Sequence, residues 1–407
     1  MGSAIEVDAD TPAGATAALR STRAVRARAR FLTERARAGE SPWFTVDAEA
    51  LASAAALVAE VTRDSYPDLQ IPFHSRWRHF EAGGVDRKSL LTGADARALV
   101  DLTVISVLLD AGAGPSWSYL EPGTCLRLSR SEGLAVASFH AFTGGLFSSD
   151  PGDPLRADAA GLAALTTEKL SAAFQNGATN PLVGLDGRVA ILRRLGTVLS
   201  AAPETFGTDG RPAGLLDAVP IPGRDEVRAH HILTVILSAL APIWPGGSMI
   251  GDQPIGDCWR HRALRGSGLT AGWMPFHKLS QWLTYSLLEP FGWAGRTVTD
   301  LDELTGLPEY RNGGLLLDTG VLRLRDPGSA ARTFTAPDEL VVEWRALTVT
   351  LLDELAPLVR EQLGVDAAQM PLARILEGGT WAAGRTLAQQ LRGGLPPLSI
   401  VSDGTVF

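Results

Sequence analysis

The sequence has few cysteines, no start typical of a leader and no hydrophobic run of membrane length. Cys125 and Cys258 are the two thiols in 407 residues, which excludes a disulfide framework and favours a reducing compartment. The N-terminus MGSAIEVDAD has neither the basic nor the apolar region of a secretory signal. The longest apolar stretch, residues 232–243, is short and interrupted by proline. We therefore expect a soluble, cytoplasmic protein with no membrane partner.

An excess of positive charge is missing as well. Lys and Arg number 37 against 45 Asp and Glu, which gives a formal net charge of -8. Nucleic-acid-binding surfaces favour the opposite balance, so no nucleic-acid partner is expected. A small anionic ligand remains possible, because a pocket needs only two or three local cations.

Several catalytic signatures are absent too. There is no GxSxG elbow, no P-loop, no GxGxxG opening a helix and no HExxH. Asp257 and His261 would share one face of a helix, but no third metal ligand has a clear spacing. We expect neither a metal nor an organic cofactor. These two residues, with Asp252, leave open an alternative: a metal-assisted amidohydrolase acting on a ureido group.

Helical periodicity dominates what is present. The spacing of apolar residues predicts helices through most of the chain, with Gly-, Pro- and Asp-rich joints and neither a repeat nor a low-complexity linker. Residues 11–39 are predicted to form an Arg-rich N-terminal helix that Thr11 caps, and residues 155–173 are predicted to form a further helix. Strand-like stretches are short. The fold class expected is mainly α: a single compact multi-helix catalytic domain over residues 1–407, with strands at Cys125–Leu128, Gly320–Leu324 and Ser399–Val401.

The segment IPFHSRWRHF at 71–80 is one of four that are unusually rich in polar, aromatic and glycine residues, and residues 251–278, which contain Asp257 and His261, are another. His74, Arg76 and His79 stand there among aromatic side chains. Guanidinium groups bind carboxylate or phosphate through two parallel hydrogen bonds. We interpret the segment as a pocket wall that binds an oxyanion; surface charge held by core aromatics is the alternative.

The segment LLDAGAGPSWSY at 108–119 places Asp110 at the end of an apolar helix, with Trp117 following. The C-terminus of a helix is electrostatically unfavourable for an anion, so Asp110 requires a compensating partner. A functional carboxylate and a locally capped one are both open.

The segment GLPEYRNGGLLLDTGV at 306–321 puts an acid, a phenol, a guanidinium and an amide side by side at Glu309, Tyr310, Arg311 and Asn312. Two glycines follow, which would allow a ligand to approach the backbone closely. The alternative is a polar turn in which Glu309 pairs with Arg311 or a distant lysine. The C-terminal SDGTVF is apolar for a tail, which suggests that it packs near the pocket.

These segments, with FQNGATNPLVGLDGR, EGGTWAAGR and the terminal SDGTVF, resemble the family of uracil-catabolism protein four along essentially the whole chain. That family belongs to a pyrimidine-degradation route in which uracil is ribosylated, its ring is opened and urea is released. The resemblance implies action on ribosylurea or its 5′-phosphate, splitting the sugar from urea.

A remoter similarity covers only short segments. FHKLSQWL and Glu309-Tyr-Arg are similar to a Lys–Gln helix and an Asp-Tyr-Arg motif in the queuosine-nucleotide salvage glycosidases. The similarity implies a fold related to helix-hairpin-helix DNA glycosylases. Glu309 stands where their catalytic aspartate stands, one methylene longer. Lys278 and Gln281 match their helix, and Asp110 and Trp117 match an acidic-then-Trp segment.

The expected function is therefore N-ribosyl hydrolysis of a small ribosyl or ribosyl-phosphate substrate. Glu309 faces the cationic sugar or activates water, Asp110 holds water or ribose hydroxyls, and Asp318 is a rival acid. A non-catalytic ligand-binding scaffold is a further alternative. Lys278, Arg311 and one residue of 76–79 are expected around one cavity. The full set of expected binding residues is Lys278, Gln281, Tyr310, Arg311, Asn312, His74, Arg76, His79 and Trp117.

Overall fold

The computed structural model describes residues 8–221, 225–244 and 248–401. The terminal SDGTVF lies outside the described residues, so its packing near a pocket stays a prediction. The expectation of a mainly helical chain with minor strands is confirmed, since the described strands form six two-stranded sheets between helices. No helix in this part of the chain has both the length and the apolar character needed to cross a bilayer.

The chain folds into two compact units, and each is described by itself. Unit 1 is built from the N-terminal segment up to His74 and from two later segments; unit 2 is built from the stretches between them. The described residues of unit 1 are 8–74, 248–278 and 301–401, and those of unit 2 are 75–221, 225–244 and 279–300. That one catalytic domain spans residues 1–407 stays a prediction.

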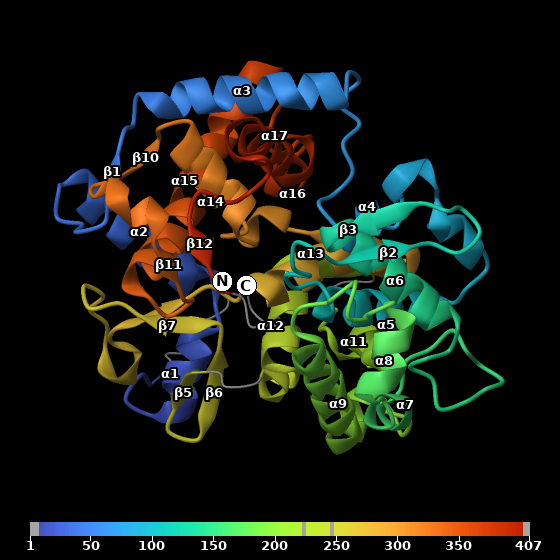
Figure 1. Ribbon diagram of the computed structural model, residues 1–407. Coiled ribbons are helices and arrows are strands. Elements are labelled where there is room, and N and C mark those ends of the chain that lie inside the picture. The colour runs from blue at the N-terminus through green and yellow to red at the C-terminus, as the bar shows by residue number, and fades with distance from the viewer. Residues whose placement is uncertain (1–7, 222–224, 245–247, 402–407) are drawn as a thin grey trace. The chain divides into compact units, whose positions relative to one another are not determined.

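Unit 1 is organised around α15, a helix of 25 residues whose central part is buried on all sides. Helices α2 and α3 from the N-terminal segment pack on α15, so blue and orange ribbons lie side by side in Figure 1. Helix α14 packs on both α15 and α17. The helices of unit 1 are α1 (Pro12–Leu19), α2 (Thr22–Arg37), α3 (Ala50–Ser65), α14 (Tyr310–Asp318), α15 (Glu339–Leu363), α16 (Leu372–Ile375) and α17 (Trp381–Arg392).

The single Arg-rich helix predicted over residues 11–39 is two helices, α1 and α2. Thr11 caps the first as expected, with its side chain accepting from the N–H of Gly14. Ser21 then caps the second by accepting from the N–H of Ala24, so the chain turns between them. Local capping by a serine outweighs the continuous Ala- and Arg-rich helix propensity.

The strands of unit 1 pair locally, except where two pairs join stretches that are distant in the chain. Strands β1 and β10 pair antiparallel and join the N-terminal segment of unit 1 to its last segment, whereas β11 and β12, which pair parallel, both belong to the last segment. Two of the predicted strand stretches correspond to β10 and β12. The bounds are β1 (Phe44–Val46), β5 (Ser248–Ile250), β6 (Gln253–Gly256), β7 (Cys258–Arg260), β8 (Trp273–Pro275), β10 (Leu322–Leu324), β11 (Thr333–Phe334) and β12 (Ser399–Ile400).

Unit 2 packs its helices around α5, which is buried along most of its length. Helix α13 (Lys278–Trp293) starts with the last residue of unit 1 and continues in unit 2 as another buried helix. The other α-helices and the strands of unit 2 are α4 (Arg76–His79), α5 (Ala96–Leu108), α6 (Arg130–Thr143), α7 (Ala159–Ala163), α8 (Thr167–Ala173), α9 (Leu185–Ala201), α10 (Pro203–Phe206), α11 (Leu215–Ala218), α12 (Ala229–Ala239), β2 (Ser118–Leu120), β3 (Arg127–Ser129), β4 (Glu226–Arg228) and β9 (Thr297–Thr299).

Candidate active site

Glu309 occupies the N-cap position of α14 in unit 1. Its two carboxylate oxygens accept from the backbone N–H of Arg311 at 2.7 Å and of Asn312 at 2.6 Å. A carboxylate at a helix N-terminus is stabilised by these donors and by the helix dipole. The local sequence therefore places the acid by ordinary capping, rather than by the pairing with the Arg311 side chain considered from the sequence.

The charge of Glu309 is set by opposing effects. Desolvation raises its pKa above the usual value for a glutamate, while the N–H groups of Arg311 and Asn312 and the positive charges of Lys278 and Arg311 lower it in part. The structure thus brings Lys278 and Glu309, which are distant in sequence, into one electrostatic environment within unit 1. A buried carboxylate whose pKa is shifted by desolvation and by nearby charges is typical of a functional site.

Lys278 is the first residue of α13, and its backbone N–H donates to Asp257 Oδ2 at 2.9 Å. Asp257 also accepts from Arg345 and from the indole of Trp259. Burial raises the pKa of Asp257, but Arg345 and these N–H donors outweigh it and bring the pKa down to about 2. Asp257 is therefore a fixed anion that orients the start of α13.

Replacing Lys278 by methionine should weaken substrate binding and shift the pH dependence. A charge-assisted hydrogen bond is worth about 1.5–3 kcal/mol, so KM for a phosphorylated substrate should rise about ten- to hundredfold. The acid limb of the pH–rate profile should move to higher pH, because the pKa of Glu309 loses a cation that lowers it. Lys169→Met, on α8, is the control, and it should change neither KM nor the acid limb. An unchanged acid limb in Lys278→Met would show that the two groups do not interact.

Arg311 and Asn312, which follow Glu309, are less exposed than the side chains of a polar turn would be, whereas Tyr310 is exposed. Arg311 is 3% exposed, with Nη1 donating to the Gly394 carbonyl at 3.4 Å and the guanidinium 4.8 Å from the Tyr310 ring centroid. Its Nε has no acceptor among the described atoms. Asn312 is fully buried and donates to the Leu307 carbonyl at 3.0 Å. A buried donor without an acceptor is costly, so this arrangement suits an oxyanion that completes it.

Of the two glycines after Asn312, Gly313 serves helix packing, which corrects for this residue the expectation of close approach to a ligand. A Cβ on Gly313 would lie 2.7 Å from the ring of Trp344, whose indole donates to the Gly313 carbonyl at 3.1 Å. A Cβ on Gly384 of α17 would lie 2.2 Å from the Arg311 carbonyl. Both glycines let neighbouring helices approach α14 closely.

His74 lies in unit 1 and pairs with Glu377, with Nδ1 and Oε2 2.7 Å apart. Its ring centroid is 6.4 Å from that of Trp381. Glu377 belongs to the π-helical turn Leu376–Thr380, and such turns are frequent at functional sites. Sequence reasoning singled out EGGTWAAGR only as a family motif and missed this carboxylate. The acid beside two glycines was the available signal.

Unit 2 holds a separate polar cluster around Asp110. Arg76 is fully buried; its Nη1 lies 3.0 Å from Asp110 Oδ1 and 3.2 Å from His79 Nδ1, and its Nε donates to Ser106 Oγ at 2.8 Å. Arg76 is the compensating partner that the position of Asp110 required. Arg188 adds bonds to carbonyls just past the end of α5. Burial lowers the pKa of Arg76 more than Asp110 raises it.

Two further predicted residues are core residues of unit 2. Trp117 is 1% exposed, and its indole donates to the Phe174 carbonyl at 2.9 Å. Gln281 is fully buried on α13. Their binding roles, the catalytic role of Asp110 and the shared cavity expected for Lys278, Arg311 and residues 76–79 stay predictions.

Two of the three candidate metal ligands, Asp257 and His261, are engaged by other groups. Asp257 and His261 flank strand β7 instead of sharing a helix face, because the chain there is extended. His261 Nε2 lies 3.0 Å from Glu343 Oε2, and its Nδ1 accepts from the N–H of Ala263 at 3.2 Å. Asp252 is exposed. Within residues 8–221, 225–244 and 248–401, no three His, Cys, Asp or Glu side chains are placed to hold a metal ion.

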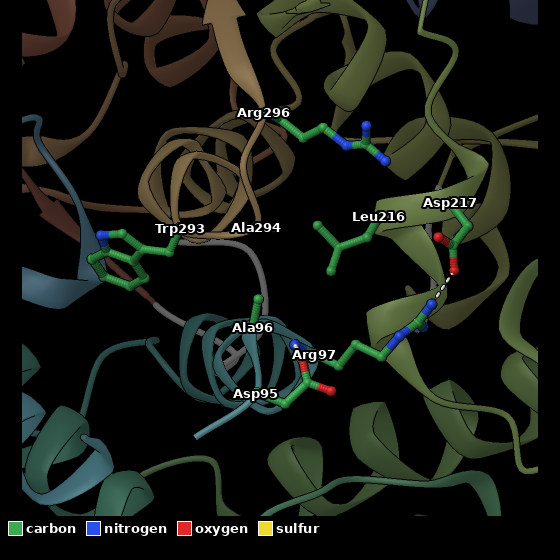
Figure 2. Close-up of a pocket in the computed structure, with 8 residues that line it drawn as sticks. All are labelled: Asp95, Ala96, Arg97, Leu216, Asp217, Trp293, Ala294 and Arg296. Atoms are coloured by element: carbon green, nitrogen blue, oxygen red, sulfur yellow. Dashed lines mark hydrogen bonds and ion pairs between the residues drawn. The ribbon is translucent and has the colours of Figure 1, made fainter. Parts of the chain in front are cut away.

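Asp318, the rival acid, ends α14 and has both oxygens held by Arg392, at 2.8 Å from Nη1 and 2.6 Å from Nη2. A pocket of about 420 Å³ in unit 2 is lined by Asp95, Arg97, Asp217, Trp293 and Arg296 with three apolar neighbours (Figure 2). None of the residues predicted for the site lines it. Glu309, Lys278 and Arg311 remain the best-supported candidate site.

The fold and this site define a mainly helical protein that holds a carboxylate and two cations together within unit 1. Comparison with known proteins gives the family. Residues 18–407 match the family described as "Protein of unknown function (DUF1688)", and the chain belongs to it. It is 40% identical over 410 residues to Protein urg3 of Schizosaccharomyces pombe, covering 96% of this chain and 98% of that protein.

The second relative agrees with the resemblance read from the motifs. The chain is 39% identical over 393 residues to Uracil catabolism protein 4 of Lachancea kluyveri, covering 86% of this chain and 89% of that protein. Membership of the uracil-catabolism protein four family is thereby confirmed.

Proposed function

We propose that this protein is a cytoplasmic N-ribosyl hydrolase of uracil degradation that splits ribosylurea, or its 5′-phosphate, into urea and ribose or ribose phosphate. The relative named Uracil catabolism protein 4 supports the pathway. The observation that carries the reaction is the carboxylate of Glu309, which is desolvated, accepts two backbone N–H bonds and interacts electrostatically with Lys278. From the motif similarity alone, we propose a fold related to helix-hairpin-helix DNA glycosylases.

The reaction breaks the C1′–N bond of the sugar and adds water at C1′. Positive charge develops on the sugar as the bond lengthens, and the leaving urea nitrogen takes up a proton. An ionised Glu309 stabilises that cation or accepts a proton from the attacking water. Both of its oxygens accept N–H bonds, which oppose the effect of burial on its pKa and suit these two roles better than that of proton donor.

Lys278 and Arg311 supply the binding of an anionic group. The guanidinium of Arg311 is buried and keeps one donor without an acceptor in the described part of the chain. A 5′-phosphate oxygen would satisfy that donor, and the ammonium of Lys278 adds a second charge. We therefore propose the 5′-phosphate form as the preferred substrate.

The test is release of urea from ribosylurea and from its 5′-phosphate by purified protein. We expect turnover of both, with a higher kcat/KM for the phosphate. Because the side chains of Asp257 and His261 are engaged elsewhere, turnover should persist with a chelator such as EDTA. Loss of activity on chelation, restored by metal, would instead favour the amidohydrolase. No urea from either compound, despite tight binding, would favour a ligand-binding scaffold.

A further inference from the structure

A buried ion pair in unit 1 contacts both of the segments that carry Lys278 and Glu309. Arg345, on α15, donates from Nη1 to Asp257 Oδ1 at 2.8 Å and from Nη2 to Oδ2 at 2.7 Å. Their side chains are 2% and 9% exposed. Such a two-pronged contact fixes direction as well as distance, which a single charge pair does not.

Asp257 binds three consecutive backbone N–H groups. Its carbonyl accepts from Phe276 at 2.9 Å and from His277 at 3.4 Å, and its Oδ2 accepts from Lys278 at 2.9 Å. His277 has a φ of +52°, a left-handed conformation that is unfavourable for a residue with a side chain. The turn into α13 is therefore imposed by its partners, and Asp257 decides where the Lys278 side chain starts.

Arg345 also contacts the segment that carries Glu309, through the Nε of its guanidinium. Its Nε donates to the Pro308 carbonyl at 3.4 Å, and Pro308 directly precedes Glu309. The guanidinium also lies 4.0 Å from the centroid of the Phe276 ring, in the first segment. The Arg345 side chain thus contacts both the segment that carries Lys278 and the segment that carries Glu309.

We propose that the Asp257–Arg345 pair is the positioning element of this site, setting the Lys278 ammonium against the Glu309 carboxylate. The inference rests on the proposed function. Buried ion pairs are often no more stabilising than apolar side chains of similar size, so a role in stability explains this pair poorly. A defined geometry between two charges that lie 31 positions apart in the chain explains it better.

The test is Arg345→Lys, which keeps the charge and removes the two-pronged contact. A displacement of about 1 Å can cost 10²-fold, so kcat/KM for ribosylurea 5′-phosphate should fall by about that factor. The acid limb of the pH–rate profile should move to higher pH. Hydrogen exchange should become faster at residues 276–278 and at 309–312 together.

Arg392→Lys is the matched control, because Arg392 makes the same two-pronged contact with Asp318 at the far end of α14. It should leave the profile unchanged. Trp259→Phe removes one donor from Asp257 Oδ1 and should cause a smaller change in the same direction. If Arg345→Lys fails to fold, the same measurements on Trp259→Phe test the proposal.

Wild-type kcat/KM and an unchanged pH profile in folded Arg345→Lys would overturn the proposal. Faster exchange in one segment alone would overturn it as well. Hydrogen exchange needs no substrate, so it tests the coupling of the two segments separately. Absence of urea release by the wild-type protein would count against the proposed function alone.

Discussion

Replacing Glu309 by glutamine is expected to lower turnover of ribosylurea 5′-phosphate by at least about 10²–10⁴-fold. This is the rate enhancement that one general acid–base group typically contributes. The substitution keeps the size of the side chain and removes its charge. A carboxylate that acts on charge developing at the sugar stabilises the transition state more than the bound substrate. KM should therefore change far less than kcat.

The capping role of Glu309 adds a second, smaller effect. A glutamine offers one acceptor oxygen where the carboxylate offers two, so one of the bonds from Arg311 and Asn312 is lost. Loss of an N-cap typically costs about 1 kcal/mol of unfolding free energy. Ser21→Ala, which removes the cap of α2 in the same unit, is the matched control: a similar loss of stability with unchanged turnover.

Melting temperature and urea release, measured on the same samples, separate the two effects. Near-normal turnover in well-folded Glu309→Gln would show that the carboxylate is only a cap. The assignment would then pass to Asp110 or Asp318, each tested by its own asparagine variant.

Replacing Arg87 by methionine is expected to destabilise unit 2 by about 3–5 kcal/mol, because it leaves a buried carboxylate without its cation. Arg87 is 1% exposed and binds both oxygens of Glu121, from Nε and Nη2, at 2.5 Å each. Its Nη1 also donates to three backbone carbonyls between residues 80 and 85. Methionine satisfies none of these acceptors.

The pH dependence of stability should change in the same variant. The hydrogen bonds from Arg87 outweigh burial and, with those from His140 and Thr124, lower the pKa of Glu121 to about 2. A lowered pKa in the folded state gives stability that is present above the unfolded value of 4.5 and is lost as pH falls through about 2. Without Arg87 this acid-sensitive contribution should be largely absent.

Guanidinium denaturation followed by circular dichroism, from pH 7 down to pH 3, measures both effects. Arg97→Met is the control, since Arg97 pairs with Asp217 at the surface, where ion pairs contribute about 0–1 kcal/mol. A loss in Arg87→Met no larger than in the control would show that the Arg87–Glu121 pair is not a stabilising contact.

The sequence alone determined the helical class, most helix positions and the cap of the first helix. Apolar periodicity and capping act within a few residues, so they can be read without the fold: Thr11 caps α1 as predicted, and β10 and β12 lie within predicted strands. Breaks inside periodic runs were harder to predict. The run 155–173 is two helices, α7 and α8, because Thr166 starts a new one by capping it.

The motifs also determined the family and pointed to Glu309, Lys278 and Arg311. What they did not reveal is how these residues are held. Arg345 gave no sequence signal, because a buried arginine in an apolar helix shows its partner only after α15 has packed beside the 257 and 308 segments.

Tertiary structure also reversed two local interpretations. Gly313 accommodates Trp344 rather than a ligand, and His261 pairs with Glu343 instead of sharing a helix face with Asp257. Both outcomes depend on contacts between residues that are tens of positions apart in the chain. Sequence spacing specifies which residues share a turn of helix, whereas packing decides which distant side chain meets them.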